Sequence, residues 1–164
     1  RRIGTQQMIT HYISYSISIT FISWIVGMLL GGVLRKTEYY KNVSNLNFIK
    51  SVTLNKRIGL GILKWIVKNT FFKYFNPNLK LKHKIEMTDL NELREEMTFA
   101  ETSHLIGFAF VTVFALFKLI NGDVLFAAIF MIVNILMNLY PSLLQQENKR
   151  RLDRLIKRFG RNAT

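Results

Sequence analysis

Long stretches without charged residues alternate with strongly basic ones along this chain. No Asp, Glu, Lys or Arg occurs between Arg2 and Arg35, and none occurs between Asp123 and Glu147. Each gap exceeds the roughly 20 apolar residues that a helix needs to cross the core of a bilayer. The pattern predicts an all-α integral membrane protein with about three transmembrane helices. The predicted spans are residues 12–34, 102–120 and 124–144.

One side of the first span carries small and hydroxylated residues. Gly27 and Gly31 form a small-xxx-small pair, which allows another helix to approach closely. Hydroxyl groups in an apolar helix can bond back to carbonyls of the preceding turn. We therefore expect this side to pack against protein rather than lipid. The hydroxylated residues are Ser14, Ser16, Ser18, Thr20 and Ser23.

Basic segments separate and follow the spans. Residues 35–98 hold thirteen Lys and Arg residues and residues 149–164 hold seven, whereas the turn at 121–123 has none. The positive-inside rule places both basic segments in the cytoplasm, and the turn and the N-terminus outside. Basic amphipathic helices that lie in the headgroup plane are predicted at 58–75 and at 147–160.

The second span continues a helix that begins earlier in the basic region. Its start is predicted at Thr88 or Asp89, and its apolar face runs unbroken into the span. Residues 1–164 therefore form a single predicted membrane domain, in which 35–98 is the cytoplasmic basic region.

Composition narrows the possible chemistry. The chain has 164 residues, 49% of them hydrophobic, a net charge of +13 and no cysteine. Absence of cysteine excludes disulfides, iron–sulfur clusters and a thiol nucleophile. Because the charges flank the spans, we expect anionic lipids rather than nucleic acid as partners. Frequent Asn, Lys, Ile and Phe suggest a bacterial gene, and hence a multi-pass protein of the bacterial inner membrane.

Glu101 and His104 stand three residues apart where the polar sequence becomes apolar, so they are neighbours on one helix surface. A carboxylate beside an imidazole stabilises its protonated form, which suits a general base that takes a proton from a hydroxyl group. The alternative is an ion pair at the membrane boundary, and spacing alone favours it. No metal site is predicted, because a di-iron bundle needs two Glu-x-x-His copies and further carboxylates.

Polar residues also follow one face of the third span and its extension. They are Asn134, Asn138, Pro141, Gln145 and Asn148, spaced by three or four residues. Buried amides can either hold helices together or form a functional site, and spacing alone favours the first. Pro141 can kink the helix and free a carbonyl group as an additional acceptor.

The segment "AETSH" (100–104), with the series from Asn138 to Leu152, resembles the glycosyl-4,4'-diaponeurosporenoate acyltransferase family. That family has an Ala-Glu-x-x-His segment before a hydrophobic hairpin, and the resemblance covers roughly residues 60 to 158. Gln146 and Glu147 stand where the family usually has Arg-Tyr. The matching positions are Ala100, Glu101, His104, Asn138, Pro141, Gln145, Asn148, Arg151 and Leu152.

The resemblance implies transfer of a fatty acyl chain to a sugar hydroxyl group of a carotenoid glycoside-type acceptor. It makes His104 the general base and Glu101 the residue that orients it. It also assigns substrate binding to Asn138, Gln145, Asn148 and Arg151. The donor would be an acyl thioester, either acyl-CoA or an acyl carrier protein, and no bound cofactor is expected.

A second function remains open from the sequence. A three-span protein with a glycine-notched first helix and a polar third helix is also typical of a non-catalytic small subunit in a larger membrane complex. With either function, 164 residues are few for an isolated catalytic cavity. We therefore expect a homo-oligomer or a larger membrane complex.

Overall fold

The computed structural model describes residues 2–46, 48–49, 57, 59–69 and 86–162. No strand occurs in this part of the chain, so the predicted all-α class is confirmed. The described residues contain three long helical segments and two short helices. They are α1 (Arg2–Arg35), α2 (Tyr39–Val43), α4 (Leu60–Asn69), α5 (Met87–Ile120) and a rod formed by α6 (Val124–Asn134), the π-helical turn η2 (Ile135–Leu139) and α7 (Tyr140–Asn162).

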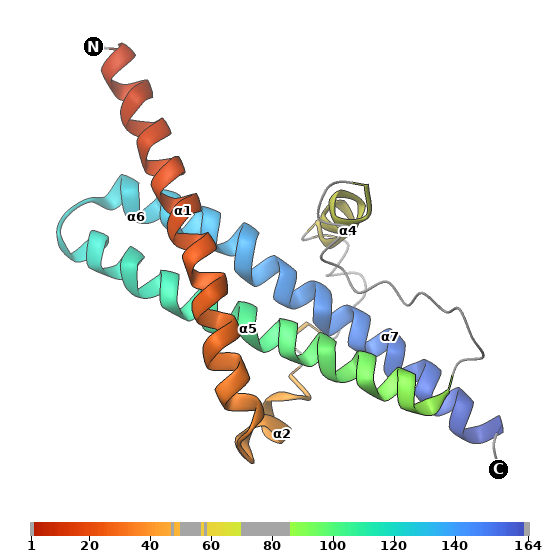
Figure 1. Ribbon diagram of the computed structural model, residues 1–164. Helices are drawn as coiled ribbons and strands as arrows, with labels where there is room; N and C mark the ends of the chain where they lie inside the picture. Colours follow the sequence, from red (N-terminus) through yellow and green to blue (C-terminus); the bar gives the residue numbers. More distant parts are fainter. Residues whose placement is uncertain (1, 47, 50–56, 58, 70–85, 163–164) are drawn as a thin grey trace.

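The rod returns antiparallel along α5, and α1 crosses this hairpin obliquely (Figure 1). Tyr12 in α1 stacks on Phe126 close to the turn, with ring centroids 4.1 Å apart. At the other end of α1, Arg35 forms an ion pair of 2.7 Å with Glu95. Helix α1 therefore runs antiparallel to α5, and its C-terminal end lies on the same side as the start of α5.

The helices contain the predicted spans. α1, α5 and the rod are each long and apolar enough to cross a membrane. The helix predicted from Thr88 or Asp89 begins at Met87, where Glu86 and Asp89 form a capping box. The helix predicted at 58–75 is seen as α4 from Leu60, and residues 70–75 lie outside the described residues.

Part of the polar side of α1 packs against α5, as predicted, but Ser14 and Ser18 are exposed, which corrects the expectation for these two residues. Ser16, Thr20 and Ser23 are fully buried, and each donates to a carbonyl group of its own helix. A side-chain carbon at Gly27 would collide with the Ser103 backbone oxygen. The missing side chains therefore set the close contact between the two backbones.

The tight turn between α5 and the rod depends on Gly122. Its φ of 83° is in the left-handed region, which glycine adopts without a steric penalty. Lys118 lies 3.6 Å from the Asp123 carboxylate and 4.8 Å above the Phe126 ring centroid. These contacts hold the end of α5 against the start of α6.

Candidate functional site

The π-helical turn η2 changes which residues of the rod face α5. A regular α-helix would keep Asn134, Asn138, Pro141, Gln145 and Asn148 on one face. The structure buries Asn134 and Asn138 as expected, but the buried polar residues that follow are Ser142, Gln146 and Lys149. A π turn contains one additional residue, so each position after it shifts by one.

Pro141 explains why the regular bonding fails at this point. Proline has no N–H group, so it cannot donate to the carbonyl group of Met137 four residues earlier. Trp24 in α1 supplies a donor instead, because its Nε1 lies 3.3 Å from the Met137 oxygen. The prediction that Pro141 frees a carbonyl group as an acceptor is confirmed.

The two buried asparagines join three helices. Asn138 Nδ2 donates to Ser23 Oγ at 3.1 Å and to Asn134 Oδ1 at 2.9 Å. Asn134 Nδ2 donates to the Phe108 carbonyl at 3.0 Å and to Thr112 Oγ1 at 3.2 Å. Both side chains are fully buried. Their amides therefore act between helices, which is the use that spacing alone favoured.

His104 lies at the junction of these three helices. Its ring is half-buried and stands edge-on to Trp24, with centroids 5.9 Å apart. It also lies next to the side chain of Asn138, whose Oδ1 accepts a hydrogen bond of 3.0 Å from Trp24 Nε1. His104 Nδ1 is covered and has no hydrogen-bond partner among the described residues. The imidazole of His104 is thus held between α1, α5 and η2.

Glu101 does not orient His104, which corrects the role inferred for it. Its carboxylate is fully buried and faces α7, where Gln146 Nε2 donates to Oε1 at 2.8 Å and Lys149 Nζ forms an ion pair with Oε2. The shift introduced by η2 brings Lys149 to this position. Removing the cation from a buried ion pair would leave the carboxylate uncompensated, so Lys149 stabilises Glu101 here. The groups that contact His104 are Trp24 and Asn138.

The same residues of α7 hold the segment that follows α2. Lys149 Nζ donates to the Ser44 carbonyl at 2.9 Å, and Gln146 Oε1 accepts from the Phe48 backbone N–H at 2.9 Å. Arg150 donates to the Ile49 carbonyl. The chain after α2 is therefore tied to α7 directly beside the buried Glu101.

The remaining residues that the sequence assigned to substrate binding lie at the surface of α7. Gln145 and Asn148 are half-exposed, and Arg151 is exposed and pairs with Glu147 at 2.9 Å. Of the four residues assigned to substrate binding, Asn138 is the one that the structure places beside His104.

Sequence reasoning missed three residues of this region, namely Trp24, Gln146 and Lys149. Trp24 stands out in the sequence as the one Trp in a span rich in Ser and Ile, although its partners do not. Gln146 and Lys149 do not stand out, because their positions depend on the additional residue in η2. A π turn leaves no periodic signal in the sequence.

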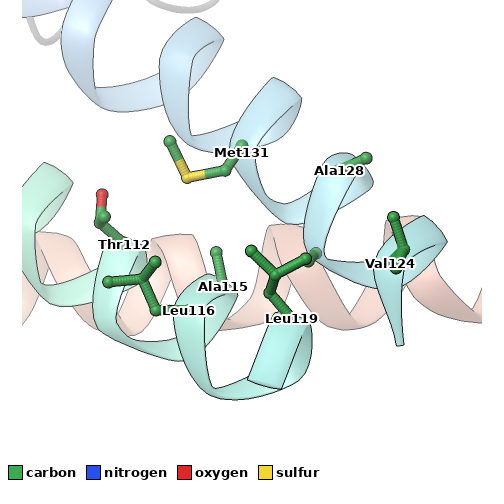
Figure 2. Close-up of a pocket in the computed structure, with 8 residues that line it drawn as sticks. Thr112, Ala115, Leu116, Leu119, Val124, Ala128 and Met131 are labelled. Atoms are coloured by element: carbon green, nitrogen blue, oxygen red, sulfur yellow. The ribbon is translucent and has the colours of Figure 1, made fainter. Parts of the chain in front are cut away.

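An apolar groove of about 320 Å³ lies between α5 and α6 near the turn (Figure 2). Thr112 is the one polar residue that lines it, and its hydroxyl group already bonds to the Phe108 carbonyl at 2.7 Å. Thr112 is eight residues from His104, or about 12 Å along the helix. The groove offers surface to an apolar chain, whereas His104 and Glu101 lie closer to the start of α5.

No group of three or more His, Cys, Asp or Glu side chains that could hold a metal ion occurs among the described residues. Three cations, Arg94, Lys149 and Arg150, line a small polar pocket beside Ser44 and Asn45.

The comparisons with known proteins agree with the resemblance seen in the sequence. A family model described as glycosyl-4,4'-diaponeurosporenoate acyltransferase matches residues 36–158, which is 123 of the 164 residues. The matched range includes Glu101, His104 and the rod as far as Arg158, and it begins directly after α1. No curated protein and no solved structure matches the chain.

Proposed function

Because the chain belongs to the glycosyl-4,4'-diaponeurosporenoate acyltransferase family, we propose that it acylates a sugar hydroxyl group of a carotenoid glycoside-type acceptor. The family supports an acyltransferase of carotenoid biosynthesis, and three helices suited to a membrane agree with a lipid-like acceptor. The donor is an acyl thioester, and the reaction takes place at the cytoplasmic end of the hairpin. The observation that carries this proposal is the imidazole of His104 at the junction of α1, α5 and η2.

His104 acts as the general base. It takes the proton of the sugar hydroxyl group while the oxygen attacks the thioester carbonyl carbon. The tetrahedral intermediate then collapses, the C–S bond breaks, and the proton passes from the imidazole to the departing thiolate. The products are an ester and a free thiol, and a thioester is sufficiently activated to need no serine nucleophile.

Asn138 and Trp24 position this base. Both contact the ring of His104, and both are held by hydrogen bonds to other helices. Because Nδ1 is covered, a hydroxyl group reaches it only when a neighbouring side chain moves. Glu101 belongs to the support of this site through α7, not to the proton transfer.

The test compares acylated carotenoid glycosides by mass spectrometry in cells that lack the gene and carry wild type or a variant. We expect His104→Ala to lower transfer by about 10²–10⁴-fold, the usual contribution of a general base. His11→Ala, which changes an exposed histidine of α1, is the matched control. Membrane abundance of each variant is measured by immunoblot.

A non-catalytic subunit is the second candidate, and the burial of both asparagine amides between helices favours it. If the ester persists without the gene, the chain is not the transferase. If His104→Ala restores the ester as well as wild type does, the base is a different group.

A further inference from the structure

The rod is longer than a membrane is thick. It has 38 residues from Val124 to Arg161, or about 57 Å, whereas the hydrocarbon core of a bilayer is about 30 Å thick. The apolar residues of the rod directly follow the tight turn, so its excess length lies at the opposite end, beside the start of α5 (Figure 1). We call this end the stalk. It consists of residues 87–97 of α5 and 150–161 of α7.

One face of each helix holds the stalk together. Leu90 and Leu93 of α5 form a buried cluster with Leu152 of α7, and Met97 and Ile156 pack against it. The apolar face of α7 is therefore used within the protein. Residues on the other faces decide what the stalk contacts.

One outer side of the stalk carries carboxylates on α5. Glu92 and Glu96 stand two residues before and after Arg94, which pairs with Asp153 at 2.6 Å. Two residues turn a helix by about 200°, so both carboxylates point away from this pair. Both are exposed, and neither takes part in an ion pair within the part of the chain that the structure describes.

The same side carries basic and apolar residues on α7. Arg151 and Leu155 stand two residues before and after Asp153, so they also point away from the pair of Asp153 with Arg94. Leu155 and Phe159, one turn apart, are 45% and 39% exposed. Apolar side chains exposed beside charged ones, beyond the hydrocarbon core, are typical of an interaction surface.

The two helices of the stalk keep one antiparallel register. Glu101 of α5 accepts a hydrogen bond from Gln146 of α7. Seven residues away on each helix, Arg94 donates to Asp153. Two further residues on each helix therefore stay in step as well.

Charges of opposite sign lie at the same level in this register. Glu96 of α5 is level with Arg151 of α7, and Glu92 is level with Leu155. Arg151 and Glu96 are on different helices of one copy and do not pair with each other, since Arg151 pairs with Glu147 at 2.9 Å. An opposite partner for Glu96 must therefore come from outside the copy.

A second copy of the chain fits this side. Rotation by 180° about an axis along the stalk brings α5 of one copy opposite α7 of the other, at the same level. Glu96 of each copy then faces the partner's Arg151, so the ion pair forms twice. The same axis keeps both copies in one orientation across the membrane. Helix α1 crosses α5 farther along, where Gly27 meets Ser103, and so lies beyond this contact.

We propose that the chain forms a two-fold dimer through this side of the stalk. Glu96 of each copy pairs with the partner's Arg151, and Leu155 and Phe159 become covered. The stalks then form a four-helix arrangement in which α5 and α7 alternate. The inference does not depend on the proposed reaction, because association is measured without turnover.

The experiment measures fluorescence energy transfer between full-length chains in liposomes, labelled at Asn121→Cys, over a range of protein-to-lipid ratios. Wild type should associate. Glu96→Arg and Arg151→Glu should each weaken association by about tenfold, because each places two like-charged pairs in the interface. Lys157→Glu is the matched control. It makes the same charge change at an exposed residue of α7 that points to the side of Asp153.

A mixture of the two single variants separates contact between copies from a role within one chain. A copy with Glu96→Arg and a copy with Arg151→Glu together have two opposite-charge pairs again, so the mixture should associate about as well as wild type. A defect within one chain would persist in the mixture, because each chain keeps its own substitution.

Leu155→Glu tests the apolar part of the surface. It should weaken association by a similar factor, because it places a carboxylate level with the partner's Glu92. This exposed position also serves if one of the charge-reversal variants does not insert into the membrane.

A wild type that stays monomeric at every protein-to-lipid ratio would overturn the dimer. Variants that all associate as wild type does would show that the copies meet along another surface. A mixture that associates no better than each single variant would show that Glu96 and Arg151 act within one chain. Each of these results removes the proposed interface.

Discussion

At the scale of single residues, the buried pair Glu101–Lys149 dominates the region around His104. Its side chains are 0% and 3% exposed, so neither charge is solvated by water. In such surroundings, a buried charge without its partner costs much more free energy than the pair does. Glu101 therefore belongs to the contact between α5 and α7, although the sequence places it beside His104.

Lys149→Met should destabilise the protein by about 3–5 kcal/mol, because it leaves the Glu101 carboxylate buried without a cation. The double variant Glu101→Gln with Lys149→Met should recover most of this loss, since both charges are gone. Denaturant unfolding in detergent measures the free energies. Lys157→Met, an exposed lysine of the same helix, is the control.

A loss under about 1 kcal/mol in the single variant would show that the pair behaves like a solvated surface pair. An undiminished loss in the double variant would show that shape, rather than charge, makes Lys149 necessary. Either result would remove the electrostatic account of this contact.

At the scale of the elements, η2 decides which face of α7 meets α5. The π turn ends at Leu139, two residues before Pro141, and Trp24 donates to the carbonyl group that Pro141 leaves free. The additional residue places Gln146 and Lys149, rather than Gln145 and Asn148, toward Glu101. The turn therefore affects both features: Asn138 of η2 lies beside His104, and the additional residue positions Lys149 for its ion pair with Glu101.

Deletion of Leu136, an exposed residue of η2, should be tolerated, because the regular α-helix that results keeps Gln146 and Lys149 on the same face. Insertion of one alanine after Leu136 should rotate both residues by about 100° and separate them from Glu101. Thermal unfolding in detergent compares the two changes. Equal melting temperatures for the deletion and the insertion would contradict this role of η2.

At the scale of the whole molecule, one end of the hairpin is basic and the other carries the tight turn. The end of α1, the start of α5 and the end of α7 gather at one side of the molecule, opposite the turn at 121–123 (Figure 1). Arg94 and Asp153, 2.6 Å apart, join α5 to α7 on this side. The positive-inside rule predicts that this side faces the cytoplasm.

The chain has no cysteine, so single introduced cysteines can report this sidedness. Asn121→Cys in the turn should react with a membrane-impermeant maleimide in intact cells, because the turn is predicted to be outside. Arg158→Cys in α7 should react only after permeabilisation, and Glu38→Cys is a second probe of that side. Labelling of Arg158→Cys in intact cells would reverse the orientation.

The sequence by itself determined the class of this protein. Charge-free stretches predicted the helices that can span a membrane, because no other backbone arrangement in a short chain satisfies its hydrogen bonds in lipid. Gly27 and Gly31 identified the contact side of α1, since small residues allow close packing wherever they occur. The "AETSH" segment and the C-terminal series indicated the family before any contact was known.

Only the tertiary structure decided which polar residues meet. An α-helical pattern assumes 3.6 residues per turn throughout, so it cannot show the one-residue shift that brings Lys149 to Glu101. Nor could the sequence pair Trp24 with Asn138, because that contact joins helices more than a hundred positions apart. The backbone sets the local periodicity of a helix, whereas packing decides which side chains of different helices meet. The neighbours of His104, Trp24 and Asn138, belong to other helices and therefore depend on packing.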